Sequence, residues 1–182
     1  TLRALLFPEE RPYSGRRIGR MEDLTAASHE DVVAFFKKYY APNNASLVVA
    51  GDIDLDATQQ LVEKWFGEIP RGAVVEPLAP PVAPQLTGVK RKTVSDQVKL
   101  PRLHLAWLTP RGYAPGDAAL DVAASILTGG KNSRLFKRLV YDTQIAQSVA
   151  AFQESQQLSG MFLIMATARP GLTARAMRGY IP

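Results

Sequence analysis

The most suggestive stretch for chemistry is a glycine-rich turn within residues 126–139, ILTGGKNSRLFKRL. A phosphate-binding loop requires G-x-x-x-x-G-K-[ST] between a strand and a helix, because its backbone N–H groups surround the phosphates. Here Ser125 occupies the first glycine position, and Asn132 follows Lys131 where Ser or Thr is required. The preceding residues also have helical periodicity. We therefore expect a corner between two helices and no nucleotide site.

The two histidines do not form a metal motif. His29 and Glu30 begin like H-E-x-x-H, but Val33 stands where the second histidine is required. His104 lies among apolar residues of a predicted strand, and a catalytic zinc normally takes three protein ligands. The chain contains no cysteine and no G-x-S-x-G, which excludes disulfides, thiolate ligands and a serine elbow. We expect no catalytic, metal or cofactor-binding residue in this chain.

Composition narrows the class of protein further. The 182 residues suffice for one large domain or one and a half small ones, and no apolar run is long enough to cross a bilayer. The net charge is +5, but the basic residues are scattered in the sequence without aromatic residues between them. Nucleic-acid surfaces combine basic and stacking side chains. We therefore expect solvated surface charge, no nucleic-acid partner and no membrane span.

The first half of the chain predicts a helix, a buried strand and a second helix. The first helix starts at Ser28, an N-cap whose capping box is completed by Asp31. Residues 45–52, ASLVVAGD, form a short apolar run typical of a buried strand, and residues 54–66 form the second helix, capped by Asp54 or Asp56. Apolar residues at helical spacing predict a buried face on each helix: Val32, Phe35, Phe36, Tyr39 and Tyr40 in the first, and Leu61, Val62, Trp65 and Phe66 in the second.

The second half follows a proline-rich connector at residues 68–86. Period-two alternation predicts strands at residues 92–98 and 103–109, and a hairpin formed by residues 145–153 and 161–169. Between them, one helix ends at a left-handed Gly129 or Gly130, and a second, capped by Asn132 or Ser133, follows it. The inward residues of this second helix are Leu135, Phe136, Leu139 and Val140.

These elements alternate irregularly and include a meander. We therefore predict an α+β fold in which helices pack on one side of a mixed, mainly antiparallel sheet.

Several ordered segments together resemble the pitrilysin/insulinase-like zinc metallopeptidases, which include the mitochondrial processing peptidases. They are RPYSGRRIGRMEDL, YYAPNNASLVVAGDID, FGEIPRG, the proline-rich connector and GGKNSRLFKRLVYDTQIAQSVAA. The resemblance covers nearly the whole chain. Such a peptidase half has two similar α+β domains, and the first carries H-x-x-E-H, whose glutamate is the general base for a zinc-bound water.

This chain has no H-x-x-E-H. The resemblance therefore implies that residues 1–23 end the preceding catalytic domain or form a linker. Residues 24–182 would be the second, non-catalytic domain, cut short at its C-terminal end. Zinc is expected in an upstream catalytic domain, and the expected partners are that domain, a second family half or subunit, and peptide substrate. A bacterial periplasm or cytoplasm is the compartment that fits best.

The resemblance also implies which half the domain belongs to. The partner half usually carries a substrate-binding arginine and, seven positions later, a tyrosine. On LVYDTQIAQSV these positions hold Val140 and Gln147, so we expect the domain to belong to the zinc-bearing half. The alternative is a catalytically inert family member that serves as an assembly or scaffold subunit.

Overall fold

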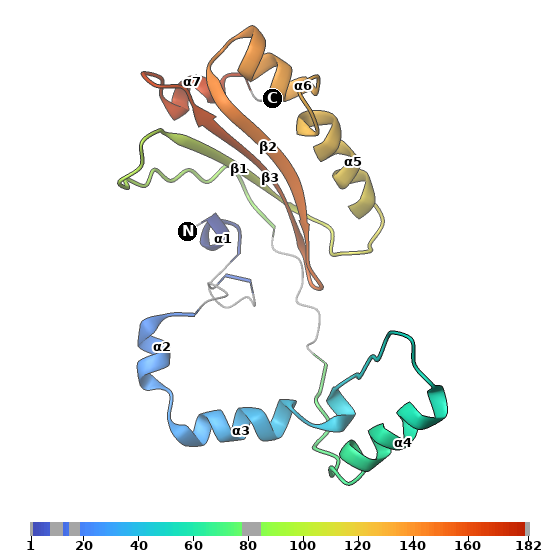
Figure 1. Cartoon of the computed structure of the whole chain (residues 1–182). Coiled ribbons are helices and arrows are strands. Elements are labelled where there is room, and N and C mark those ends of the chain that lie inside the picture. Colours follow the sequence, from blue (N-terminus) through green and yellow to red (C-terminus); the bar gives the residue numbers. More distant parts are fainter. Residues whose placement is uncertain (1, 8–12, 15–18, 78–84, 181–182) are drawn as a thin grey trace. The chain divides into compact units, whose positions relative to one another are not determined.

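The computed structural model describes residues 2–7, 13–14, 19–77 and 85–180. The chain divides into two compact units, which are taken separately here (Figure 1). Residues 16–79 form the helical unit, and residues 1–15 together with 80–182 form the sheet unit. Residues 78–84 of the predicted connector lie outside the described residues.

The helical unit contains α2 (Met21–Ala26), α3 (His29–Tyr39), the 3-10 turn η1 (Pro42–Asn44) and α4 (Leu55–Phe66). The capping box of α3 is formed as predicted: Asp31 N donates to Ser28 Oγ at 3.1 Å, and Ser28 N donates to Asp31 Oδ2 at 2.9 Å. At α4, Ala57 N donates to Asp54 Oδ1 at 2.8 Å. Of the two candidates, Asp54 is therefore the cap.

Asn43, just after α3, is hydrogen-bonded to the segment that follows α4. Asn43 Oδ1 accepts from Gly72 N at 2.8 Å, and Asn43 Nδ2 donates to the carbonyl of Ala73 at 3.2 Å. A Cβ on Gly72 would lie 2.4 Å from Ala41 Cβ, so only glycine allows this approach. Asn43 thereby places the segment after α4 beside the end of α3.

Two predictions fail in the helical unit. Residues 45–50 are extended but form no strand, because no neighbouring strand among the described residues supplies hydrogen-bond partners. The apolar faces expected to be buried are also open: Phe35 is 52% exposed and Trp65 is 68% exposed. Propensity and capping determine these helices locally, whereas burial requires a second surface.

The sheet unit contains a three-stranded antiparallel sheet in the order β1-β3-β2. The strands are β1 (Arg102–Thr109), β2 (Ala146–Ser155) and β3 (Gly160–Ala168), which confirms the predicted second strand and the hairpin. β1 pairs with β3 from Arg102 opposite Thr167 to Thr109 opposite Gly160. The predicted α+β fold with an antiparallel sheet is confirmed.

Helices cover one face of this sheet. They are α5 (Asp117–Thr128), α6 (Arg134–Phe136), the π-helical η2 (Lys137–Asp142) and α7 (Ala174–Arg178). The core beneath them includes Leu135, Leu139 and Val140, three of the four residues predicted to point inward, together with Val149, Phe162, Ile164 and Met177. The short α1 (Leu2–Leu6) packs on the other face, where Leu6 and Phe7 cover Met161 and Leu163.

Three local predictions in the sheet unit need correction. Residues 92–98 form no strand, because Val98 N donates to the carbonyl of Asp96 at 2.9 Å and turns the chain. Gly129 has φ −71° and is not left-handed; a Cβ there would lie 2.6 Å from the Ser125 carbonyl oxygen. Ser133 precedes α6, but its hydroxyl donates to the Gly130 carbonyl and does not cap the helix.

A buried carboxylate fixes the start of α5 against the sheet. Asp117, 9% exposed, accepts from Ser155 Oγ at 2.5 Å, Tyr113 N at 2.9 Å and Gln153 Nε2 at 3.2 Å. The Ser155 hydroxyl and the Tyr113 N–H hold the pKa of the Asp117 carboxyl below its usual range, because they stabilise the charged form. Further along α5, Thr128 Oγ1 accepts from Ala151 N on the edge of β2 at 2.8 Å.

No helix among the described residues is both long and apolar enough to cross a membrane.

Leu139 provides a test of the core because its side chain is fully buried. Leu139→Ala should lower the free energy of unfolding by about 2–5 kcal/mol, since the cavity removes packing as well as transfer energy. Urea unfolding followed by Trp107 fluorescence measures this in a Trp65→Phe background, because the chain has only two tryptophans. Lys137→Ala, an exposed change in the same helical segment, should stay within about 0.5 kcal/mol.

The Asp117 network should make stability fall in acid. A folded pKa below the unfolded value of about 3.9 contributes stability that is present above this value. That stability is lost as the pH falls through the folded pKa. Asp117→Asn should therefore lower the urea midpoint at pH 7, and its difference from the unmodified chain should shrink as the pH approaches about 2. Asp121→Asn, on the exposed side of α5, is the control. A constant difference across this pH range would contradict the assignment.

Candidate functional site

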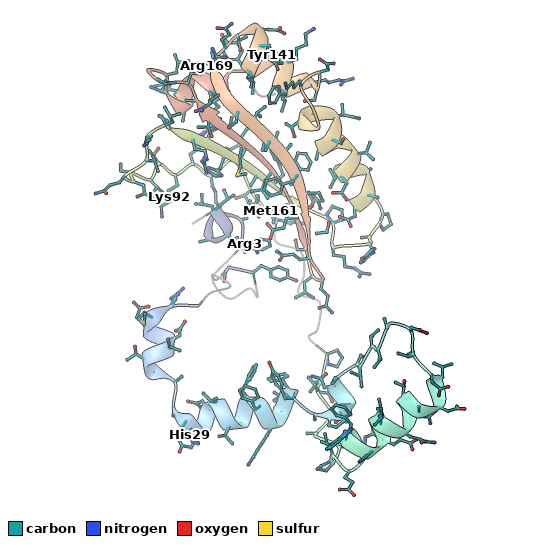
Figure 2. The ribbon with its side chains drawn as sticks, viewed as in Figure 1. Arg3, His29, Lys92, Tyr141, Met161 and Arg169 are labelled. Atoms are coloured by element: carbon teal, nitrogen blue, oxygen red, sulfur yellow. The ribbon has the colours of Figure 1, made fainter. Side chains whose placement is uncertain are left out.

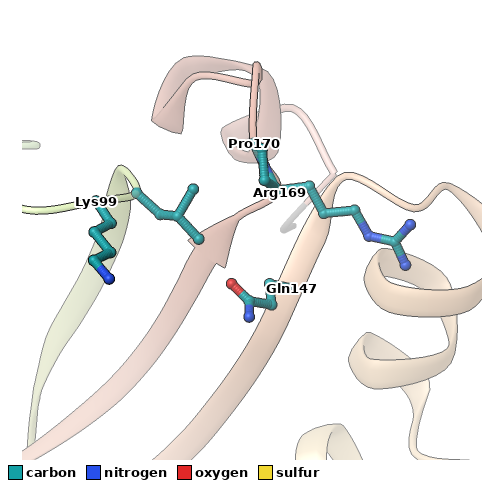
Figure 3. A pocket seen from close by; sticks show the side chains of 5 residues that line it. Lys99, Gln147, Arg169 and Pro170 are labelled. Atoms are coloured by element: carbon teal, nitrogen blue, oxygen red, sulfur yellow. The ribbon is translucent and has the colours of Figure 1, made fainter.

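An open groove lies at one end of the sheet, where β1 and β2 begin and β3 ends. It is lined by Lys99, Leu100, Gln147, Arg169 and Pro170 and has a volume of about 670 Å³ (Figure 3). We call it the sheet-end groove. Its residues come from three separate stretches of sequence, which the antiparallel pairing of β1 and β2 with β3 brings together.

Arg169 braces one wall of the groove. Its Nη2 donates to the Val140 carbonyl at 3.0 Å, its Nη1 to Gln144 Oε1 at 3.2 Å and its Nε to the Ala146 carbonyl at 3.4 Å. Figure 3 shows the guanidinium turned away from Gln147, so the aliphatic part of Arg169 faces the groove. The brace holds a turn in which Gln144 has φ 53°, a conformation that non-glycine residues seldom adopt.

The sheet face opposite the helices is only partly covered. Near Met161 it is closed by α1, where Arg3 forms an ion pair with Glu154 and Tyr13 Oη accepts from Leu158 N at 3.0 Å (Figure 2). Toward the groove the same face is open. The strand register assigns six residues to this part, which we call the open face: Arg102, His104, Ser148, Ala150, Met165 and Thr167. Four of the six are exposed.

The sheet unit is more basic than the helical unit. Residues 85–182 contain thirteen Lys and Arg against five Asp and Glu, whereas residues 16–79 contain seven against ten. Lys99 and Arg102 lie at the start of β1, and neither forms an ion pair with any described residue. Partial burial, and then the positive charge of Arg102, hold the pKa of the His104 imidazole below its usual value.

The residues first considered for chemistry belong to different elements. His29 begins α3 in the helical unit, His104 lies on β1 in the sheet unit, and Lys131 is in the exposed turn before α6. Among the described residues there is no group of three or more His, Cys, Asp or Glu that could hold a metal ion.

The two positions matched to the peptidase substrate pair have different surroundings. Val140 is 8% exposed and belongs to the core, although its carbonyl receives the Arg169 guanidinium. Gln147 is exposed and lines the sheet-end groove. Only the second position can meet a ligand directly.

The sequence analysis did not identify Lys99, Arg102 and Arg169 as a group. Lys99 and Arg102 precede Arg169 by 67 or more positions, so spacing along the sequence does not indicate that they lie at the same end of the sheet. A signal exists in the ends of the predicted strands: if residues 103–109 and 161–169 pair antiparallel, the basic residues that flank them meet at one end of the sheet.

Comparison with known proteins gives a family and a fold. Residues 26–178 match the family described as "Peptidase M16 inactive domain". The chain is 28% identical over 171 residues to zinc protease PqqE of Helicobacter pylori, covering 92% of this chain and 38% of that protein. It is 30% identical over 150 residues to the uncharacterized zinc protease YmxG of Bacillus subtilis, covering 81% and 35%.

The fold agrees with this family. The crystal structure of a protease from Helicobacter pylori superimposes with a TM-score of 0.79 at 26% identity, over 93% of this chain and 42% of that one. The chain thus spans about two-fifths of the length of the proteins it matches. The family match extends over both units, from α2 to the end of α7. This chain therefore belongs to the pitrilysin/insulinase-like M16 peptidase family, as an inactive domain of that family.

Proposed function

We propose that this chain is the non-catalytic C-terminal domain of a zinc-dependent endopeptidase half. In this role it packs on the catalytic domain of its parent protein and helps to enclose a peptide substrate. The parent's zinc lies in the catalytic domain, since this sequence carries no H-x-x-E-H. Two relatives that bear the name zinc protease and extend well beyond the matched region support such a parent.

The observation that carries the packing role is the open apolar surface of the helical unit. On α3 and α4, aromatic and aliphatic side chains such as Phe36 and Phe66 are 49% and 54% exposed. Large contiguous apolar patches are rare on monomeric domains and mark surfaces that are covered in an assembly. In the parent protein, the catalytic domain is the neighbour that this surface would contact.

The segment at residues 45–50 supports the same role. Leu47, Val48 and Val49 are 59%, 85% and 46% exposed, although their composition is typical of a buried strand. An extended apolar segment with free N–H and C=O groups can pair with the edge of another sheet. Helix, extended segment and helix then offer one packing layer to the catalytic domain.

The sheet-end groove and the open face support the substrate-enclosing role. Together they form a concave, solvent-exposed surface on the sheet unit. The helices α5, α6, η2 and α7 cover the opposite face of the sheet. The edge strand β1 borders this wall, and edge strands bind extended peptides through main-chain hydrogen bonds.

The assignment predicts where zinc and activity reside. Incubated with zinc and an unfolded peptide, residues 1–182 should show neither stoichiometric tight zinc binding nor turnover. The parent should cleave the peptide, lose activity with a chelator and lose it again when the glutamate of its H-x-x-E-H is changed to Gln, because that residue is the general base. A parent without H-x-x-E-H and without turnover would instead be a catalytically inert assembly subunit.

The packing role predicts that Leu61→Ala lowers the free energy of unfolding more in the parent protein than in this chain alone. Leu61 is 55% exposed in this chain, so Leu61→Ala should change its free energy of unfolding by less than about 0.5 kcal/mol. In the parent the same change should cost about 2–5 kcal/mol, because the side chain is then buried. Gln60→Ala, a neighbouring exposed change, should be small in both. Equal small effects of Leu61→Ala in chain and parent would contradict packing through α4.

A further inference from the structure

The sheet-end groove and the open face share a chemical bias that the proposed function leaves open. Lys99 lines the groove, and Arg102, three residues later, is the first residue of β1 and of the open face. Neither has a carboxylate partner among the described residues. We propose that the two surfaces together bind an extended acidic peptide segment, whose carboxylates meet Lys99 and Arg102. This inference rests on the proposed role in enclosing peptide, and it names the substrate class.

Among the described residues, the hydrogen-bonding pattern of β1 leaves unpaired backbone N–H and C=O groups at Arg102, near Lys99. Ala168 N donates to the Pro101 carbonyl at 2.9 Å, so the Pro101 backbone faces β3. In an antiparallel strand the next residue then directs its N–H and C=O to the opposite side, which here is the free edge. Arg102 and, two residues later, His104 therefore offer main-chain hydrogen bonds to an added strand.

The same pairing selects acidic side chains. A peptide residue opposite Arg102 places its side chain on the open face, with the two Cβ atoms about 5 Å apart. Its carboxylate reaches the Arg102 guanidinium, and a second carboxylate two positions along the peptide extends the acidic pattern toward the groove, which Lys99 lines. Glutamate at alternate positions is therefore the pattern that fits this edge, and lysine at those positions is repelled.

The surroundings strengthen this preference. The Arg169 guanidinium donates to the carbonyls of Val140 and Ala146 and to the side-chain oxygen of Gln144. Because these acceptors are neutral, the positive charge of Arg169 adds to the potential of the groove. Burial lowers the pKa of the His104 imidazole, and the positive charge of Arg102 on the open face lowers this pKa further. Nucleic acid fits less well, because it has no backbone that pairs with a strand edge.

The test measures the binding of three labelled decapeptides to residues 1–182 by fluorescence anisotropy at low ionic strength. Thr alternates with Glu in the first peptide, with Gln in the second and with Lys in the third. The Glu peptide should bind about tenfold more tightly than the Gln peptide, and the Lys peptide more weakly than either, because each contact is a partly exposed charge pair. Added salt should narrow these differences.

The double variant Lys99→Glu, Arg102→Glu should reverse the order of the Glu and Lys peptides. The matched control is Lys131→Glu, Arg134→Glu, which changes the charge equally at exposed positions around the start of α6 and should leave the order unchanged. Far-UV circular dichroism verifies that each variant is folded. Equal affinities for the Glu and Gln peptides overturn the proposal, and so does an equal loss in both double variants.

Two further arms separate this inference from its alternatives. A ten-nucleotide oligothymidine that binds more tightly than the Glu peptide, and is lost in the Lys99, Arg102 variant, overturns the peptide assignment. In the parent, kcat/KM for an acidic substrate should exceed that for its Gln counterpart, and the double variant should remove the difference. A parent that cleaves both equally, with no effect of the variant, overturns the inference while the proposed function stands.

Discussion

The sheet unit depends on the hydrogen-bonded pairing of β3 with a strand on each side. β3 is the central strand, and its residues from Gly160 to Ile164 are all buried. Its alternation supplies both packed surfaces: Phe162 and Ile164 face the helices, and Met161 and Leu163 face α1. A shift of one residue in this pairing would exchange the two faces, so the register determines what each face presents.

The same pairing creates the candidate binding surface. Because β1 and β2 both run antiparallel to β3, the residues before β1 meet those after β3 at one end of the sheet. This brings Lys99 and Arg169 to the same groove, so two basic residues line that end of the sheet. At the other end the buried Asp117 carboxylate and the Arg3–Glu154 pair serve structure: the first fixes α5, and the second fixes α1. Among the described residues, Arg3 is paired with a carboxylate at this end, whereas Lys99 and Arg102 at the groove end form no ion pair.

Sequence reasoning succeeded where a structure is determined locally. The Ser28 capping box, the Asp54 cap and the hairpin of β2 and β3 depend on residues close together in the chain. It failed where burial or pairing needs a distant partner: residues 45–50 remain without a ladder, and Trp65 remains exposed. The absence of a metal motif and the family resemblance were readable without coordinates. The sheet-end groove was not, because its residues come from three separate stretches of sequence.

The sequence by itself determined the longer helices, the Ser28 capping box, the three strands of the sheet, the α+β class and the peptidase family. These follow from short-range periodicity, side-chain hydrogen bonds near helix ends and ordered motifs. Only the tertiary structure decided that Gln147 lines a groove, and that Lys99, Arg102 and Arg169 gather at one end of the sheet. The physical reason is that strand order and register arise from pairing between distant segments, which the spacing of residues along the chain does not encode.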